Sequence, residues 1–190
     1  MRTLAFLITI ACARMACAAS VQTVAVPPPA HADTESCAHL AVPPLADRTA
    51  LRVALALNAS PSNSLSAAVG VDADGDGRLS LREQALEFGW DGGAWFIRRR
   101  TPQGWERYEW PGPDGPQVFE AVLSFGQPGR RWLRLSVGGV PLVGGSFWVG
   151  GWLPPEAVEG GVVRVTARGS GVGGTAEVAA TTEGTVLLLR

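Results

Sequence analysis

The stretch at residues 117–125, QVFEAVLSF, decides the fold class, because its apolar side chains fall at every second position. Phe119, Ala121, Leu123 and Phe125 share one side of an extended chain, and Glu120 lies on the other. A strand with one buried face repeats every second residue, whereas a helix repeats every about 3.6 residues. The segment therefore predicts a β-strand that is half-buried in a sheet.

The same alternation recurs along the chain, in SLSAAVGV at residues 64–71 and RRWLRLSV at residues 130–137. Further strand candidates cover residues 51–58, 94–99, 162–167, 175–180 and 185–190. Glycine-rich turn signals separate them, at residues 91–93, 102–104, 126–129, 138–139, 144–145, 169–174 and 183–184. No long helical pattern competes with these signals, so we expect an all-β fold, an antiparallel β-sandwich made of hairpins in series.

The 190 residues suffice for one domain with appendages. Residues 1–19 have Arg2, an apolar run over 4–13 and small residues at Ala16 and Ala18, which predicts a signal peptide and a secreted, periplasmic or cell-surface protein. Acylation of Cys12 or Cys17 is the alternative. Residues 20–46 are expected to be a Pro/Ala-rich linker and residues 47–190 a single β-sandwich domain. No later apolar run approaches the about 20 residues of a membrane span.

The net charge and the positions of the two histidines disfavour several classes of function. The net charge is −1 and the 16 basic residues are all Arg, so nothing in the composition favours nucleic acid. His31 and His39 both lie in the expected linker, which removes the usual general base of serine and cysteine hydrolases. A glycosidase using Glu106, Glu109 or Glu120 stays open, but exposed strand glutamates are the simpler interpretation. We therefore expect no enzyme.

The segment DADGDGRLSLRE at residues 72–83 has the spacing of a calcium loop. Such a loop needs oxygen ligands at positions 1, 3, 5, 7, 9 and 12 and a glycine at position 6, here Gly77. The expected ligands are Asp72, Asp74, Asp76, the carbonyl of Arg78, Ser80 and Glu83. Leu79, at position 8, is expected to attach the loop to the domain.

This segment resembles the EF-hand or dockerin-type loop, and the resemblance implies calcium as the bound ion. The flanking sequence alternates like strands instead of forming the helices of an EF-hand, so we expect a calcium loop inserted between strands. Residues 61–96 also resemble a group of exported bacterial proteins of unassigned function, which join an apolar strand, one such loop and a Gly-Trp-Asp hairpin.

The seven tryptophans all fall between Trp90 and Trp152. Most are expected in the core, but the polar segment WERYEW makes Trp105 and Trp110 the candidates for exposed ligand-binding residues.

The sequence leads to two hypotheses about the function of the protein. The first is a non-catalytic, calcium-stabilised binding or adhesion module for a glycan or protein. The alternative is a structural or assembly component of the cell envelope with purely structural calcium.

Overall fold

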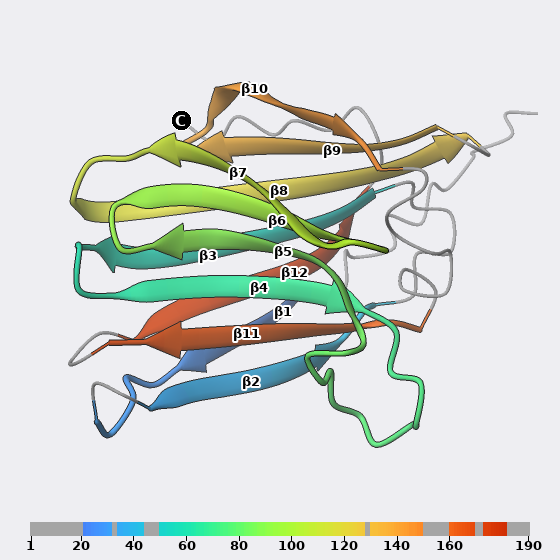
Figure 1. Ribbon diagram of the computed structural model, residues 1–190, viewed down its shortest axis with the longest axis horizontal. Coiled ribbons are helices and arrows are strands. Elements are labelled where there is room, and N and C mark those ends of the chain that lie inside the picture. Colours follow the sequence, from blue (N-terminus) through green and yellow to red (C-terminus); the bar gives the residue numbers. More distant parts are fainter. Residues whose placement is uncertain are drawn as a thin grey trace, which may run out of the picture.

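The computed structural model describes residues 21–31, 34–43, 50–127, 130–149, 160–169 and 173–181. Within these ranges the chain forms strands without any helix, and the strands make two six-stranded antiparallel sheets packed face to face (Figure 1). The expected all-β sandwich is therefore confirmed. A search of the same ranges for a helix long and apolar enough to cross a membrane finds none.

The first sheet has the strand order β1-β12-β3-β8-β9-β10. Its strands are β1 (Val21–Val26), β12 (Gly174–Thr181), β3 (Ala50–Ala59), β8 (Gly115–Gln127), β9 (Arg130–Val137) and β10 (Val140–Trp148). The segment QVFEAVLSF, residues 117–125, lies in β8, where Phe119, Ala121 and Leu123 are fully buried. Arg52 on β3 joins three neighbouring strands through ion pairs to Glu120 on β8 and Glu177 on β12.

The second sheet has the order β2-β11-β4-β5-β6-β7. Its strands are β2 (Glu35–Ala41), β11 (Val162–Arg168), β4 (Ser64–Gly70), β5 (Gln84–Asp91), β6 (Ala94–Thr101) and β7 (Gly104–Pro111). In Figure 1 this sheet faces the viewer and the first sheet lies behind it. Each sheet therefore has one face toward the shared core and one face toward solvent.

The core between the sheets contains two of the tryptophans. Trp95 stacks on Phe119 of the opposite sheet, with ring centroids 4.9 Å apart, and Trp90 meets Trp95 edge-on at 5.1 Å. Both indoles are almost completely buried, but the expectation that most tryptophans lie in the core is wrong for the described residues. Trp105, Trp132 and Trp148 are exposed, and Trp110 is partly buried. The rings of Trp90 and Trp95 fasten one sheet to the other, because aromatic pairs add to the apolar area that they bury.

The expectation of hairpins in series is only partly right. Consecutive hairpins build β4 to β7 and β8 to β10, but β3 lies between β8 and β12, and β4 lies between β5 and β11. The glycine pair at 144–145 makes no turn between strands. It lies inside β10, where the register with β9 shifts between Pro141 and Ser146 and Gly144 has φ of 71°. Such a bulge adds residues without ending the strand.

The expectation of a linker over residues 20–46 is wrong, because β1 and β2 are strands of the two sheets. Val26 is buried in the core, and Val24 and Leu40 pack against it. The proline and alanine content suggested a tether, but strand pairing with β12 and β11 supplies the hydrogen bonds that this composition alone does not predict. The domain thus includes residues from Val21 onward, and the expected signal peptide at 1–19 lies outside the described residues.

Candidate functional site

The acidic loop, residues 71–83, connects β4 directly to β5, as the sequence predicted. Figure 1 shows it projecting from the second sheet beyond the end of β4. Its two ends meet closely at Gly70, where a Cβ atom would lie 2.1 Å from the carbonyl oxygen of Glu83. Only glycine permits this approach, so the sequence places Gly70 where the loop returns to the sheet.

Two carboxylates hold the loop closed through its own backbone. Asp72 accepts hydrogen bonds from the N–H groups of Gly75 at 2.8 Å and Gly77 at 2.7 Å. Glu83 accepts hydrogen bonds from the N–H groups of Ala73 at 2.9 Å and Ser80 at 2.8 Å. Gly77 has φ of 78°, a conformation that glycine adopts without strain. Asp72 and Glu83, the first and last expected ligands, therefore fix the conformation of the loop backbone in addition to contributing negative charge.

Three of the expected metal ligands converge. Asp72, Asp74 and Asp76 each offer an oxygen atom within 4.8 Å of the other two. Glu83 is outside this group, although it lines the same hollow as Asp74 and Asp76. Ser80 and Arg78 also line that hollow. The donor set consists of hard oxygen atoms, which suits calcium better than zinc or copper.

The electrostatics of the loop are those of crowded negative charges. A hydrogen bond from the Asp76 N–H lowers the pKa of Asp74, but the negative charge of Asp76 and lesser effects outweigh it, so the pKa of Asp74 is raised overall. In contrast, hydrogen bonds from Ser80 and from the backbone of Ala73 lower the pKa of Glu83. A divalent cation among these carboxylates would relieve the repulsion that acts on Asp74.

Leu79 attaches the loop to the sheet, as expected. Its side chain is 1% exposed and packs with Ala68 of β4 and Val162 of β11 in a small second apolar cluster. The Leu79 N–H donates a hydrogen bond to Nδ1 of His39 on β2 at 3.0 Å. Burial lowers the pKa of His39, and the positive charges of Arg164 and Arg78 lower it further, which outweighs the opposite effect of Asp76. The lowered pKa favours the neutral ring, which can accept this bond.

A hollow of about 240 Å³ lies between the acidic loop and strands β2 and β11. Cys37 and His39 line it from β2, and Arg164 lines it from β11. The Sγ of Cys37 lies 4.0 Å from Nε2 of His39. Because residues 20–46 were expected to be a linker, the sequence did not predict that these side chains would border the loop.

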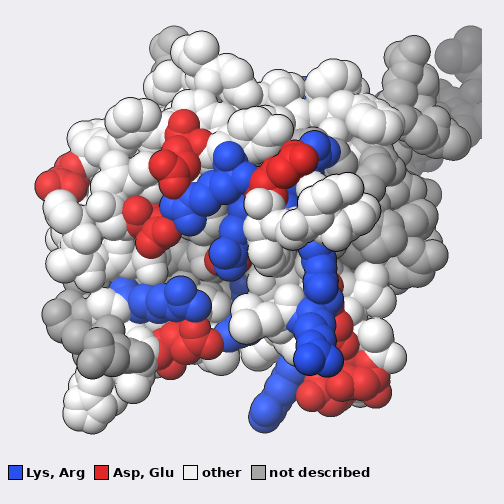
Figure 2. Space-filling view, viewed as in Figure 1, with Lys and Arg blue, Asp and Glu red and all other residues white. Residues whose placement is uncertain are grey.

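The acidic loop borders a broad polar surface, the outer face of the second sheet. One row of residues in direct register crosses all six strands, namely His39, Arg164, Ala68, Glu87, Arg98 and Arg107. Figure 2 shows basic and acidic side chains interleaved over this face. They form ion pairs, which include Arg98 with Glu87, Arg107 with both Asp91 and Glu109, and Glu35 with both Arg164 and Arg168.

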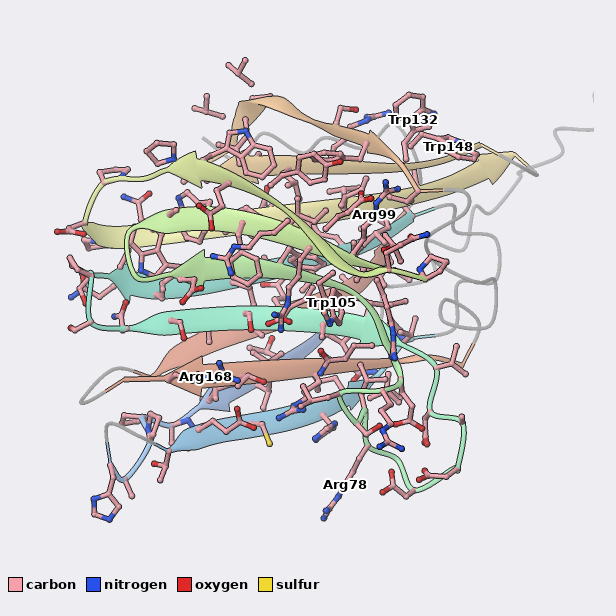
Figure 3. All side chains as sticks on the ribbon, in the orientation of Figure 1. Arg78, Arg99, Trp105, Trp132, Trp148 and Arg168 are labelled. Atoms are coloured by element: carbon pink, nitrogen blue, oxygen red, sulfur yellow. The ribbon has the colours of Figure 1, made fainter. Side chains whose placement is uncertain are left out.

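Trp105 lies on this outer face, where the sequence predicted an exposed tryptophan (Figure 3). Its side chain is 38% exposed, and the Arg98 guanidinium lies 4.7 Å from the ring centroid. Its direct partner on β6 is Arg100, which donates a hydrogen bond to the carbonyl of Arg82 in the acidic loop. Trp105 is therefore connected to the acidic loop through one arginine.

Trp110 is not on this face, and the expectation that it is exposed is wrong. It lies on the inner side of β7, partly buried, and its Nε1–H donates to the carbonyl of Val143 on β10 at 2.8 Å. Its ring meets Phe147 edge-on at 5.9 Å. The approach of β10 to β7 causes this burial. The alternation within WERYEW places Trp105 and Trp110 on opposite faces of the strand, but it does not reveal which face β10 covers.

Two exposed tryptophans were missed. Trp132 on β9 and Trp148 on β10 are 40% and 52% exposed (Figure 3). The segment WLRLSV gave a usable signal for Trp132, because it places this residue on the side of Arg134, away from Leu133 and Leu135. Trp148 had no comparable signal, since the bulge in β10 interrupts the alternation before it.

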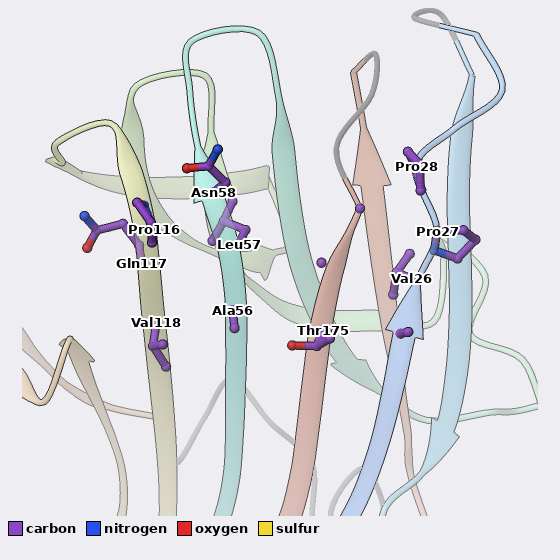
Figure 4. A pocket seen from close by; sticks show the side chains of 13 residues that line it. Val26, Pro27, Pro28, Ala56, Leu57, Asn58, Pro116, Gln117, Val118 and Thr175 are labelled. Carbon is purple, nitrogen blue, oxygen red and sulfur yellow. The ribbon is translucent and has the colours of Figure 1, made fainter. Parts of the chain in front are cut away.

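A second hollow, of about 670 Å³, lies at the far end of the first sheet (Figure 4). Residues of β1, β3, β8 and β12 line it, including Val26, Ala56, Val118 and Thr175. None of its lining residues is charged. The lining residues of this hollow therefore include no charged group that could act in catalysis or bind a metal ion.

No protein-family model matches the sequence, and a search of curated proteins finds no match. Solved structures do match. The carbohydrate recognition domain of Emp46p is 7% identical with a TM-score of 0.52, over 86% of this chain and 85% of that one. Sheep galectin-11 is 14% identical with a TM-score of 0.43, and the match covers 72% of this chain and 93% of that one. An endo-β-1,4-glucuronan lyase from Trichoderma reesei is 10% identical with a TM-score of 0.43, and the match covers 86% of this chain and 81% of that one. At these identities the likeness concerns the fold alone.

Proposed function

We propose that this chain is an exported, non-catalytic domain that binds glycan through the outer face of its second sheet, and that calcium fastens the acidic loop beside that face. The observation that carries the proposal is Trp105, an exposed indole set among arginines and carboxylates on one continuous sheet face. The carbohydrate recognition domain of Emp46p has a similar fold, which fits this proposal.

The chemistry of this face suits a sugar. A pyranose ring offers an apolar C–H surface that packs on an indole and hydroxyl groups that need hydrogen-bond partners. Trp105 supplies the indole, and Arg107, two residues further along β7, supplies donors on the same face. Its ion-pair partners Asp91 and Glu109 supply acceptors. These groups already bind one another, so they are held in place before the ligand arrives, which reduces the entropy lost on binding.

We propose a non-catalytic domain because the carboxylates on the outer face are held in ion pairs. Glycoside hydrolysis needs two carboxyl groups on either side of the scissile bond, one of which must exchange a proton. On the outer face Glu87, Asp91 and Glu109 are each bound by an arginine. Each of these carboxylates is already engaged in an ion pair, an arrangement that suits ligand positioning better than catalysis.

The role proposed for calcium is structural. Asp72, Asp74 and Asp76 converge on one point, and Glu83 closes the loop beside them. An ion there would hold the loop against β2 and β11 and would keep the carbonyl of Arg82 in position for Arg100, the strand partner of Trp105. Calcium would therefore strengthen glycan binding without contacting the glycan.

The test is a glycan array with the purified domain, followed by titration calorimetry on the best ligand, with calcium and with chelator. We expect Trp105→Ala to weaken binding about tenfold or more, since an aromatic anchor dominates such contacts, and Trp105→Phe to retain part of it. Val140→Ala, on an exposed residue of the first sheet, is the control. Binding that is unchanged in Trp105→Ala would contradict the proposal. No glycan binding together with self-association would favour the alternative, an assembly component of the envelope.

A further inference from the structure

The first sheet presents an aromatic pair on its own outer face, separate from the outer face of the second sheet. Trp132 and Trp148 are direct partners in the antiparallel register of β9 and β10. Directly opposed residues of such a pair point to the same side, with Cβ atoms about 4.5–5.5 Å apart. The two indoles therefore stand side by side on the surface, as Figure 3 shows.

The core does not need this pair. Leu133 of β9 is fully buried, and its partner Phe147 of β10 packs against Tyr108 and Trp110. Trp132 and Trp148 point the opposite way, and each residue is exposed to two-fifths or more. A pair of adjacent exposed indoles is unusual for a surface without a binding role, because each indole has a large apolar area.

The next row of the same face is polar. Arg134 and Ser146 are direct partners, and they follow Trp132 and Trp148 two residues away on their strands. Among the described residues, no carboxylate lies within ion-pair distance of Arg134, although six other arginines have such partners. The surface thus combines two indoles with an arginine that has no carboxylate partner in the described part of the chain.

We propose that Trp132, Trp148, Arg134 and Ser146 form a second saccharide-binding surface, and that it takes a polysaccharide containing uronic acid. The indoles pack against the C–H faces of sugar rings. The guanidinium of Arg134 pairs with a sugar carboxylate, for which its planar fork is well suited, and the Ser146 hydroxyl donates to or accepts from a ring hydroxyl. The charge of Arg134 favours this occupant over an apolar protein surface, which would leave the guanidinium buried without a partner.

The experiment uses the full domain in the Trp105→Ala background, so that binding by the second sheet does not interfere. Binding to alginate, to polygalacturonate and to a neutral β-glucan is measured by affinity gel electrophoresis and calorimetry at low and moderate salt. We expect binding to the anionic polymers, weakened about tenfold or more by Trp132→Ala or Trp148→Ala. Arg134→Gln should remove the preference for anionic over neutral polymer.

The controls separate folding from binding. Val140→Ala lies on the same strand as Trp148 but outside this surface, and it should bind like its parent. Each variant is melted, and a variant with an unchanged melting temperature but lost binding supports the proposal. Anionic binding that persists in the double Trp132→Ala, Trp148→Ala variant overturns it, as does self-association that these substitutions abolish while no polymer binds. Either result leaves the Trp105 test of the second sheet intact.

Discussion

His39 on β2 accepts, through Nδ1, the backbone N–H of Leu79 in the acidic loop at 3.0 Å, which joins segments 40 residues apart in the sequence. A neutral imidazole that accepts at Nδ1 has its proton at Nε2, on the side of Cys37. The bond therefore depends on both the presence and the tautomer of this one ring, and it adds to the apolar contacts of Leu79 that dock the loop.

Replacement of His39 by alanine should destabilise the domain. The Leu79 N–H would lose its partner in a partly buried position, which costs about 1–3 kcal/mol. A melting temperature lowered by several degrees is the expected result. His31→Ala is the matched control, because that exposed histidine uses only its backbone groups to contact Thr34. Equal melting of the two variants would show that the bond contributes nothing.

Calcium should raise the melting temperature, and Asp74→Asn should abolish that rise. At millimolar calcium and a dissociation constant on the order of 0.01–0.1 mM, the gain is roughly 1.4–2.7 kcal/mol. Asp74 suits this test, because its oxygen accepts only a single 3.2 Å hydrogen bond, from the N–H of Asp76, among those described. Asp72 and Glu83 also hold the backbone, so their substitution should lower stability even without calcium.

The same variant gives a second readout without calcium. Since the charge of Asp76 acts against the ionised form of Asp74, Asp74→Asn should melt no lower than wild type in chelator. Differential scanning calorimetry with and without calcium measures both effects. A wild-type domain that melts identically in calcium and chelator, and takes up no calcium in a titration, would show that the loop is an acidic turn without metal.

Glu35 should make stability depend on acid pH. Burial raises the pKa of Glu35, but hydrogen bonds and charges from Arg168 and Arg164 outweigh this, so its pKa is lowered overall. The folded state therefore favours the ionised carboxylate, and its contribution is present above the unfolded pKa and is lost as the pH falls through the lower folded pKa. Melting from pH 6 to pH 3 should separate Glu35→Gln from wild type near neutrality and bring the two together at low pH. A constant difference across this range would contradict the ion pairs.

Removal of residues 1–45 should prevent folding. The deletion strips β1 and β2, which uncovers the edges of β12 and β11 and takes Val26 and Leu40 away from the core. Open edges of this kind promote aggregation. Removal of residues 1–20 alone is the control and should leave the melting transition in place. Soluble, cooperatively melting protein from the longer deletion would show that the first two strands are dispensable.

The alternation of apolar and polar residues predicted the strands in which it is strong. It failed where contact with a segment distant in the sequence decides the local structure. The alternation over residues 117–125 predicted a half-buried strand, and Leu79 is buried as its position in the loop indicated. The strand β2 was missed, because its polar and small residues become a strand only by pairing with β11. The His39 contact was missed for the same reason. Trp110 was placed wrongly, because β10, 33 residues away, covers it.

The pairing of the first described strands with the last has a consequence for how the chain folds. Val21 pairs with Ala179, and Glu35 pairs with Arg168, so β1 and β2 have no partner within their own sheets until the final strands exist. Contacts between positions so far apart make loop closure costly and folding slow. During synthesis the early strands must remain unpaired until residues 162–181 have been made. The two sheets should therefore be completed only once β11 and β12 have been made, in a step limited by the arrival of these two strands.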